Sequence, residues 1–383
     1  MGVLDLFVAS VIPVVKVLLI TALGSFLAID FVDILGLDAR KHLNNVVFFV
    51  FNPALVGSNI AKYITLRSMA VLWFMPLNIL ITFIIGSILG WLLIRSSRAP
   101  HELWGLVLGC CSAGNLGNLP MIIIPAVCKE KGSPFGDVDI CYTHGLAYAS
   151  LSMAIGSIYM WSYVYNIVRF YSTNGSSAGA KLLPLNDMDQ FEVDSTLPQI
   201  SVMDRIKQGF RMVTKFNIRT LFAPSTAGAV VGFSIGTIPQ LRKALIGENA
   251  PLHVLPDCAS LVGDAAIPAI TLVVGANLLK GLKGSAVQPQ IIMGIVVVRY
   301  IILPICGVVI VKSAVQLGWV GSDPLYQFIL LLQFALPPAM NIGMMTQLFG
   351  AGETECSVIL LWSYAVATLS LTLWSTFFMW LVG

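Results

Sequence analysis

Charged residues are scarce in this chain. They make up 11% of its 383 residues, against about 25% in an ordinary globular protein, while hydrophobic residues make up 57%. The formal net charge of +3 is small and spread out, so it gives no basic surface that would bind nucleic acid. The mean hydropathy is +0.86. The composition therefore predicts an all-α polytopic membrane protein whose main surroundings are a lipid bilayer.

Sequence signatures of catalysis are missing as well. The chain has no GxSxG, HExxH or Walker loop and no pair of intramembrane aspartates with protease spacing. Its seven cysteines are odd in number and show no CxxC spacing, which predicts neither a disulfide framework nor a metal site. We therefore expect a protein that is not an enzyme and that has no metal or cofactor.

Apolar windows of about 20 residues, the length needed to cross a bilayer, recur along the chain. They lie at 6–29, 43–62, 69–94, 103–127, 144–169, 218–238, 254–279, 289–313, 325–349 and 356–382, which predicts ten transmembrane helices. One long connection, 171–216, begins with a stretch rich in Ser, Gly, Asn and Asp. Such a composition cannot bury a core, so this segment is predicted to be a polar, partly disordered linker.

The linker divides the ten windows into two sets of five, in residues 1–170 and 217–383. Two copies of a unit with an odd number of spans enter the membrane in opposite orientations. Short matches in corresponding spans support a duplication. They are GSNIAK at 57–62 with GANLLK at 275–280, and NLG at 115–117 with NIG at 341–343. The pattern predicts two inverted five-helix repeats.

The orientation follows from the basic residues, which are enriched in cytoplasmic loops. The odd-numbered loops hold 13 Lys and Arg residues and the even-numbered loops hold 7. Both termini are therefore predicted to lie away from the cytosol, with the central linker in the cytosol.

Two of the predicted spans contain residues that break a helix. In span nine, LPPAMNIGMM at 336–345 places Pro337 and Pro338 side by side, which removes two backbone donors. In span four, CCSAGNLGNLPMIIIP at 110–125 gathers glycines, asparagines and Pro120. Unpaired backbone groups are costly in hydrocarbon, so the two breaks predict a protected polar cavity where broken crossover helices meet.

Half-helices that begin at such a cavity present the positive ends of their dipoles, which favours an anion such as a carboxylate. Asparagine side chains would add neutral donors. The candidate binding residues are Asn115, Asn118 and Asn341 at the breaks, with Asn52 and Asn277 beside the breaks in spans two and seven. A single kink of this kind more often serves packing than binding, but its repetition in both halves favours binding.

Charged residues inside the spans are few. Asp264 lies one turn before Pro268 and is a candidate for proton transfer or substrate contact; the alternative is a carboxyl bonded to a freed backbone group. Lys16 and Arg299 either pair with a carboxylate or extend to the membrane interface, and a structural role is favoured for Arg299. An ion antiporter would need several acids at the crossing, and only Asp264 qualifies here. A pore usually repeats polar or charged rings, whereas these breaks are asymmetric within each helix.

Several long segments resemble the PIN-LIKES family of plants, the auxin-transport facilitators related to PIN auxin efflux carriers. The resemblance covers nearly the whole chain. It is carried by IPVVKVLLITALG at 12–24, LDARKHLNNVVFFVFNPALV at 37–56, WFMPLNILITFIIGSILGW at 73–91, GCCSAGNLGNLPMIIIPAVCKEKGSPFGD at 109–137 and QFALPPAMNIG at 333–343.

This resemblance implies a fold like that of PIN carriers and bile-acid symporters, with ten helices in two inverted repeats. It also implies residence in the endoplasmic reticulum membrane and movement of auxin, chiefly indole-3-acetate, from cytosol to lumen. In PIN carriers the substrate carboxylate meets asparagine and broken helix ends in spans four and nine. By motif, Asn115, Pro337, Pro338 and Asn341 take those roles here.

Two other functions agree with the same residues. One is an ion-coupled carrier of another organic anion, which would require sodium or a proton gradient. The other is a membrane receptor or scaffold that binds auxin without moving it. A homodimer is also compatible with the sequence.

The orientation makes a prediction about glycosylation. The sequon Asn174-Gly-Ser176 begins the central linker, so it faces the cytosol and stays unmodified. Endoglycosidase treatment of the protein from plant membranes should leave its gel mobility unchanged. A mobility shift would place the linker in the lumen and reverse the orientation.

Overall fold

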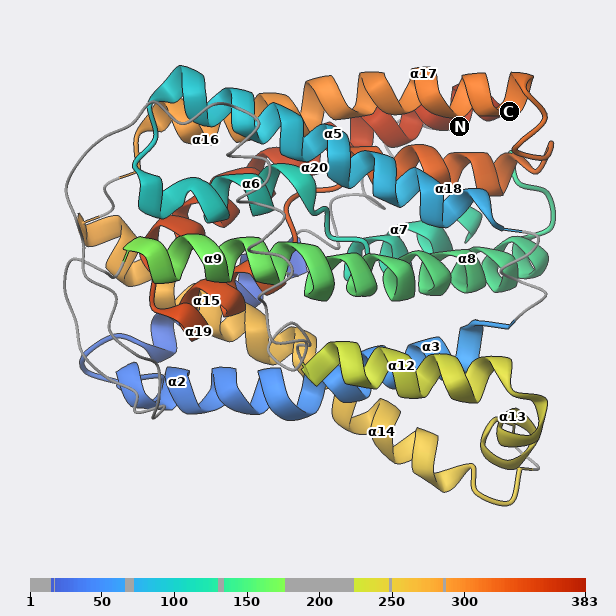
Figure 1. Cartoon of the computed structure of the whole chain (residues 1–383), viewed down its shortest axis with the longest axis horizontal. Helices are drawn as coiled ribbons and strands as arrows, with labels where there is room; N and C mark the ends of the chain where they lie inside the picture. The colour runs from blue at the N-terminus through green and yellow to red at the C-terminus, as the bar shows by residue number, and fades with distance from the viewer. Residues whose placement is uncertain are drawn as a thin grey trace, which may run out of the picture.

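The computed structural model describes residues 15–16, 18–65, 72–129, 134–175, 224–247, 250–284 and 287–383. Within these ranges the chain is almost entirely helical (Figure 1). The predicted linker from residue 176 to residue 216 lies outside the described residues, and so does the first part of the window 6–29.

The helices of the first half follow one another from α2 to α9. They are α2 (Leu37–Val46), α3 (Asn52–Tyr63), α5 (Phe74–Ser97), α6 (Trp104–Ser112), α7 (Asn118–Lys129), α8 (Val138–Tyr159) and α9 (Tyr165–Gly175). A π-helical turn, Val47–Phe51, joins α2 to α3, and another, Met160–Val164, joins α8 to α9. Helix α9 runs to Gly175, so its last residues extend into the segment predicted as the linker.

The second half is built in the same manner. Its helices are α12 (Pro224–Thr237), α13 (Pro239–Leu245), α14 (Val254–Asp264), α15 (Ala266–Gly284), α16 (Pro289–Val297), α17 (Leu303–Gln316), α18 (Pro324–Ala335), α19 (Asn341–Phe349) and α20 (Glu353–Val382). A third π-helical turn, Val298–Ile302, joins α16 to α17. Turns of this kind widen a helix locally and are frequent at functional sites.

Five helical stretches are long and apolar enough to cross a membrane. They are Leu37–Tyr63, Phe74–Ser97, Val254–Leu278, Pro289–Gln316 and Glu353–Val382. Each coincides with one of the ten predicted windows. The windows 103–127 and 325–349 instead hold two shorter helices each, as expected for broken spans.

The helices form two groups with their axes roughly along the long dimension of the molecule (Figure 1). In that view the upper group contains α5 to α9, α16 to α18 and α20, and the lower group contains α2, α3, α12 and α14. Helices α15 and α19 lie between the groups. Segments from both halves of the chain therefore build each group.

Glycines allow helices to approach closely within each group. In the lower group, the α-carbons of Gly228 and Gly232 on α12 face backbone atoms of Pro53 and Gly57 on α3, where any side chain would collide. In the upper group, the α-carbon of Gly86 on α5 likewise faces backbone atoms of α6. Small residues at such spacing hold membrane helices together by van der Waals contact, since lipid supplies no hydrophobic driving force.

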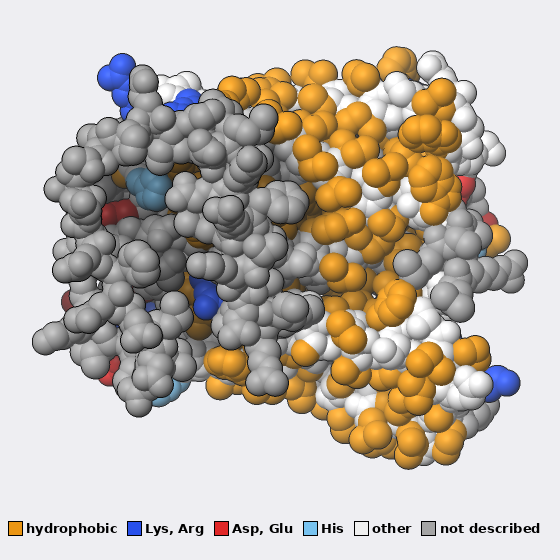
Figure 2. Space-filling model, viewed as in Figure 1, with side chains coloured by type: hydrophobic (Ala, Val, Ile, Leu, Met, Phe, Trp, Pro, Cys, Tyr) orange, Lys and Arg blue, Asp and Glu red, His pale blue; other side chains and the backbone are white. Residues whose placement is uncertain are grey.

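The outer surface is apolar. On the face shown in Figure 2, hydrophobic side chains cover the centre and right, and charged side chains lie toward the left and right ends. Large exposed side chains include Trp91, Val309, Leu373 and Trp380. Exposure of so much apolar surface is the pattern expected of a protein in contact with lipid.

A disulfide bond joins Cys128 in α7 to Cys141 in α8. The expectation that the cysteines form no disulfide is therefore wrong. The two residues are 13 positions apart, and the sharp reversal between α7 and α8 brings their α-carbons to 5.6 Å. Cysteine spacing does not reveal such a pair because the proximity arises from the helical hairpin.

This bond can be tested by thiol labelling. Reduction of the denatured protein should expose two more thiols to maleimide than are labelled without reductant. Cys128→Ser should abolish that difference and lower the free energy of unfolding by about 2–3 kcal/mol, because a closed loop constrains the unfolded chain. The exposed, free Cys258 provides the control: Cys258→Ser should remove one label with and without reductant.

Candidate functional site

The two broken spans are interrupted at corresponding places. Helix α6 ends at Ser112 and α7 begins at Asn118, while α18 ends at Ala335 and α19 begins at Asn341. The local sequence explains both interruptions. Pro337 and Pro338 lack the N–H groups that would continue α18, and the segment after α6 contains two glycines, which disfavour helix.

The two extended segments pair with each other. Gly114 and Pro338 form an antiparallel β-bridge. The Asn115 N–H donates to the Pro337 carbonyl at 2.8 Å, and the Ala339 N–H donates to the Ala113 carbonyl at 3.0 Å. Each interruption therefore satisfies backbone groups that the other leaves without helical partners, which matters because such groups are costly when buried.

A tyrosine from α20 fastens this crossing. The Asn115 side-chain amide donates to the Tyr364 hydroxyl at 2.7 Å, and that hydroxyl donates to the Pro338 carbonyl at 3.2 Å. Tyr364 is 3% exposed and Asn115 is 7% exposed. The hydroxyl thus links a side chain of one interruption to the backbone of the other.

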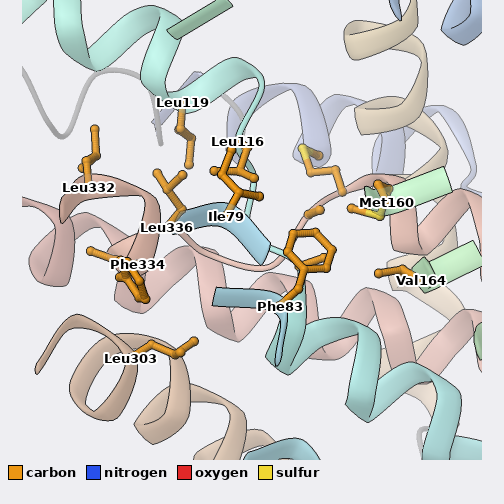
Figure 3. Packing of buried hydrophobic residues seen from close by; sticks show 14 of the residues in the cluster. Ile79, Phe83, Leu116, Leu119, Met160, Val164, Leu303, Leu332, Phe334 and Leu336 are labelled. Carbon is orange, nitrogen blue, oxygen red and sulfur yellow. The ribbon is translucent and has the colours of Figure 1, made fainter. Parts of the chain in front are cut away.

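Apolar side chains support the crossing from behind. Figure 3 shows Leu116 and Leu336, one from each interruption, close to Ile79 of α5 and Leu119 of α7. All four are buried, and Ile79, Leu119 and Leu336 have no solvent exposure. Dense packing of this kind keeps the two extended segments in one position.

A cavity of about 60 Å³ lies beside the crossing. Its walls come from α3 and α15 on one side and from α8 and the crossing on the other. The polar lining side chains are Asn52, Asn59, Asn115, Ser157 and Asn341, and the apolar ones include Leu55, Val56, Met153, Met160, Ile267 and Ile270. The cavity therefore lies between the two groups of helices.

Three of the predicted ligands, Asn52, Asn115 and Asn341, meet in this cavity. Pro337 and Pro338 are buried in the crossing that forms its wall. Asn118 is the first residue of α7, and Pro120 is buried in the first turn of the same helix.

The structure does not bring Asn277, Asp264 or Lys16 into the cavity. The Asn277 side-chain oxygen accepts a hydrogen bond from Arg40 of α2 at 3.0 Å. Asp264, at the end of α14, and Lys16 are both exposed.

The cavity is electrically neutral in its side chains. Among the described residues that line it, none is Asp, Glu, Lys, Arg or His. The N-termini of α7 and α19 border it, since Gly117 and Asn341 are lining residues. Amide donors and helix N-termini favour a negatively charged group without a cation in direct contact. In the described part of the chain, no three His, Cys, Asp or Glu side chains gather as a metal site would require.

The chain is similar to known membrane transport proteins. A family described as membrane transport protein matches residues 9–375. Protein PIN-LIKES 1 of Arabidopsis thaliana is 54% identical over 394 residues, covering 100% of this chain and 81% of that protein. The chain belongs to the PIN-LIKES family of membrane transport proteins. Protein PIN-LIKES 3 of the same plant is 52% identical, with 99% of each chain covered, and Protein PIN-LIKES 4 is 46% identical, with 100% of each covered. The family predicted from the sequence is therefore confirmed.

Sequence reasoning missed several residues of this PIN-LIKES site. Tyr364 lies in the middle of an apolar run, and no local pattern marks its hydroxyl as a partner of Asn115. Asn59 and Ser157 also line the cavity. Asn59 lies two helical turns after Asn52 in α3, so it falls on the same helix face, and this spacing was a usable signal.

Replacing Tyr364 by Phe tests the crossing. The change removes the hydroxyl that joins Asn115 to Pro338, so it should lower the free energy of unfolding by about 1–2 kcal/mol and weaken ligand binding as Asn115 loses its position. Thermal unfolding and ligand titration in detergent measure both effects.

Tyr300→Phe is the matched control. Its buried hydroxyl donates to the Ser363 carbonyl at 2.7 Å and has no bond to Asn115. This variant should lose a similar amount of stability and keep wild-type affinity. Equal affinities in both variants would contradict a positioning role for Tyr364.

Proposed function

We propose that this protein is an auxin transporter of the endoplasmic reticulum membrane, which moves indole-3-acetate and related carboxylates from cytosol to lumen and so contributes to intracellular auxin homeostasis. The observation that carries the proposal is the neutral, amide-lined cavity at the crossing of the two broken helices. Membership of a family of membrane transport proteins supports it. The proposed architecture is ten spans in two inverted five-helix repeats, residues 1–170 and 217–383.

The carboxylate of the substrate is placed at Asn115 and Asn341. These side chains lie in one cavity, and Asn341 also begins α19. A carboxylate there accepts hydrogen bonds from the amides and lies at the positive end of a helix dipole. Asn52 faces the same space from the opposite wall, so it can contact the substrate from the other group of helices.

The indole ring is placed against the apolar lining. Pockets for small organic ligands are mostly apolar, with a few polar groups that fix the orientation. Here the apolar side chains come from both walls: Leu55, Val56, Ile267 and Ile270 on one side, Met153 and Met160 on the other. Methionine adapts its shape to a flat ring and gives favourable sulfur–aromatic contacts.

The size of the cavity supports an alternating-access mechanism. Ligand pockets usually enclose about 300–1,000 Å³, and a site for one water needs about 10–15 Å³. At about 60 Å³ the cavity holds only a few waters, so the walls must move apart before a two-ring acid fits. Since the walls belong to different helix groups, movement of α3 and its neighbours against the crossing would open it to one side and then the other.

The disulfide supports the proposed orientation. Cys128 and Cys141 flank the fourth loop, which lies on the same side as the termini in the predicted topology. The chain end agrees with this, because Gly383 packs against Pro134 of that loop. Disulfides persist in the lumen of the endoplasmic reticulum and are rare in the cytosol. The linker, with more basic residues, is then cytosolic.

The proposal is tested by uptake into liposomes. Purified protein should carry labelled indole-3-acetate above the level of empty liposomes, without sodium or an imposed pH difference. Asn115→Ala and Asn341→Ala should reduce uptake by roughly tenfold or more, because each removes a hydrogen bond to a charged group in a buried site.

Asn166→Ala is the matched control. Asn166 is half-buried on α9, its amide donates to the Ser162 carbonyl in the preceding π-helical turn, and it does not line the cavity, so uptake should stay at the wild-type level. Uptake that appears only with sodium or a proton gradient would favour the ion-coupled carrier. Saturable binding without uptake under any gradient would favour an auxin-binding protein that does not transport. Wild-type uptake in both cavity variants would falsify the crossing as the site.

A further inference from the structure

An arginine is buried at the back of the crossing. Arg299 lies in the π-helical turn Val298–Ile302 and is 0% exposed. Its Nε donates to the Cys110 carbonyl in the last turn of α6 at 2.8 Å. Its other two nitrogens, Nη1 and Nη2, have no hydrogen-bond partner among the described residues. Of the alternatives predicted for Arg299, extension to the membrane interface does not occur, because the side chain is fully buried.

The guanidinium lies against the wall of the cavity. A β-carbon built on Gly114 would lie 3.4 Å from Nη1, so the guanidinium lies next to Gly114. Gly114 itself lines the cavity and pairs with Pro338 in the bridge. Arg299 is not a lining residue. Its charge is thus separated from the cavity by the backbone of the crossing.

This positive charge has no negative partner in the described part of the chain. The ionisable side chains that interact with it are Cys110, Cys111, Tyr300 and Tyr364, which are neutral thiols and phenols at physiological pH. A buried charge without a counter-charge is costly. Ionisable residues inside membrane proteins therefore usually have a functional role. One hydrogen bond to the end of α6 satisfies only part of the guanidinium.

We propose that Arg299 is the fixed positive charge that makes the cavity select anions, and that the carboxylate of the bound substrate is its counter-charge. This inference rests on the proposed function, because it names the determinant of charge selectivity at the same site. Arg299 is a positioning residue that acts through the backbone of the crossing and does not touch the ligand. In a low-dielectric interior its field reaches across that backbone, so it adds to the effect of the helix N-termini.

The proposal has a specific consequence for ligand choice. A carboxylate gains from the field of Arg299, whereas a neutral amide of the same shape does not. Indole-3-acetate should therefore bind more tightly than indole-3-acetamide. A small aromatic acid such as benzoate should also raise the unfolding temperature of the protein more than benzamide does.

Thermal unfolding of the full-length protein in detergent, titrated with these four compounds, measures the preference. The wild type should prefer each acid over its amide by roughly tenfold or more, the scale of one charge interaction in a buried site. Arg299→Gln should lose most of that preference while keeping the amide affinity, because only the helix N-termini and the neutral amides then favour the acid. Arg299→Lys should retain it, because it keeps the charge.

Lys312→Gln is the control for loss of a positive charge. Lys312 lies farther along the same continuous helix, and its ammonium donates to the Leu381 carbonyl at 2.9 Å, away from the crossing. The Lys312→Gln variant should prefer acids over amides as strongly as the wild type does. Equal loss of acid and amide affinity in Arg299→Gln would show a purely structural role and overturn the proposal.

The remaining outcomes are also decisive. If Arg299→Gln does not fold, Arg299→Lys decides, since a folded lysine variant without acid preference contradicts a role for the charge. A wild type that binds acids and amides equally overturns the proposal regardless of variants. If benzoate shows the preference and indole-3-acetate does not bind, charge selectivity stands and the auxin function fails.

Discussion

Backbone polar groups at membrane depth must find partners, and the site of this protein depends on how two broken helices meet that constraint together. The segments 113–115 and 337–339 exchange the hydrogen bonds that their own helices cannot supply. Because the pairing is mutual, neither interruption can persist without the other. It also sets the positions of Asn115 and Asn341, brings two helix N-termini to one cavity, and gives Tyr364 a fixed carbonyl to bind.

Much of this arrangement was predictable from the sequence. Paired prolines and clustered glycines cannot continue a helix, so the two breaks follow from local chemistry, and the polar residues beside them mark the cavity. The sequence does not contain the distances across the fold. Tyr364 and Arg299 owe their roles to residues of other helices, and Asn277 faces Arg40 because of how α15 packs on α2. The Cys128–Cys141 bond depends on the geometry of a hairpin in the same way.

The positive potential of the site is dispersed. Helix N-termini, neutral amides and a guanidinium behind the backbone each contribute a part, and no cation lines the cavity among the described residues. For a carrier this distribution has an advantage over a direct ion pair. A carboxylate held by a buried Lys or Arg in contact would be difficult to release, whereas one attracted by several weaker sources binds and leaves more readily. The proposed selectivity for anions is then compatible with turnover.

The disulfide between α7 and α8 has a mechanical consequence. It ties the end of α7 to the start of α8, so the hairpin behaves as one stiff lever with the crossing at its far end. The bond thereby links Met153 of α8 and Met160 of the adjoining π-helical turn mechanically to the helix N-terminus at Asn118. In the proposed alternating-access movement, the displacement then falls on the opposite wall, where α3 packs closely against α12 along a seam of glycine backbone.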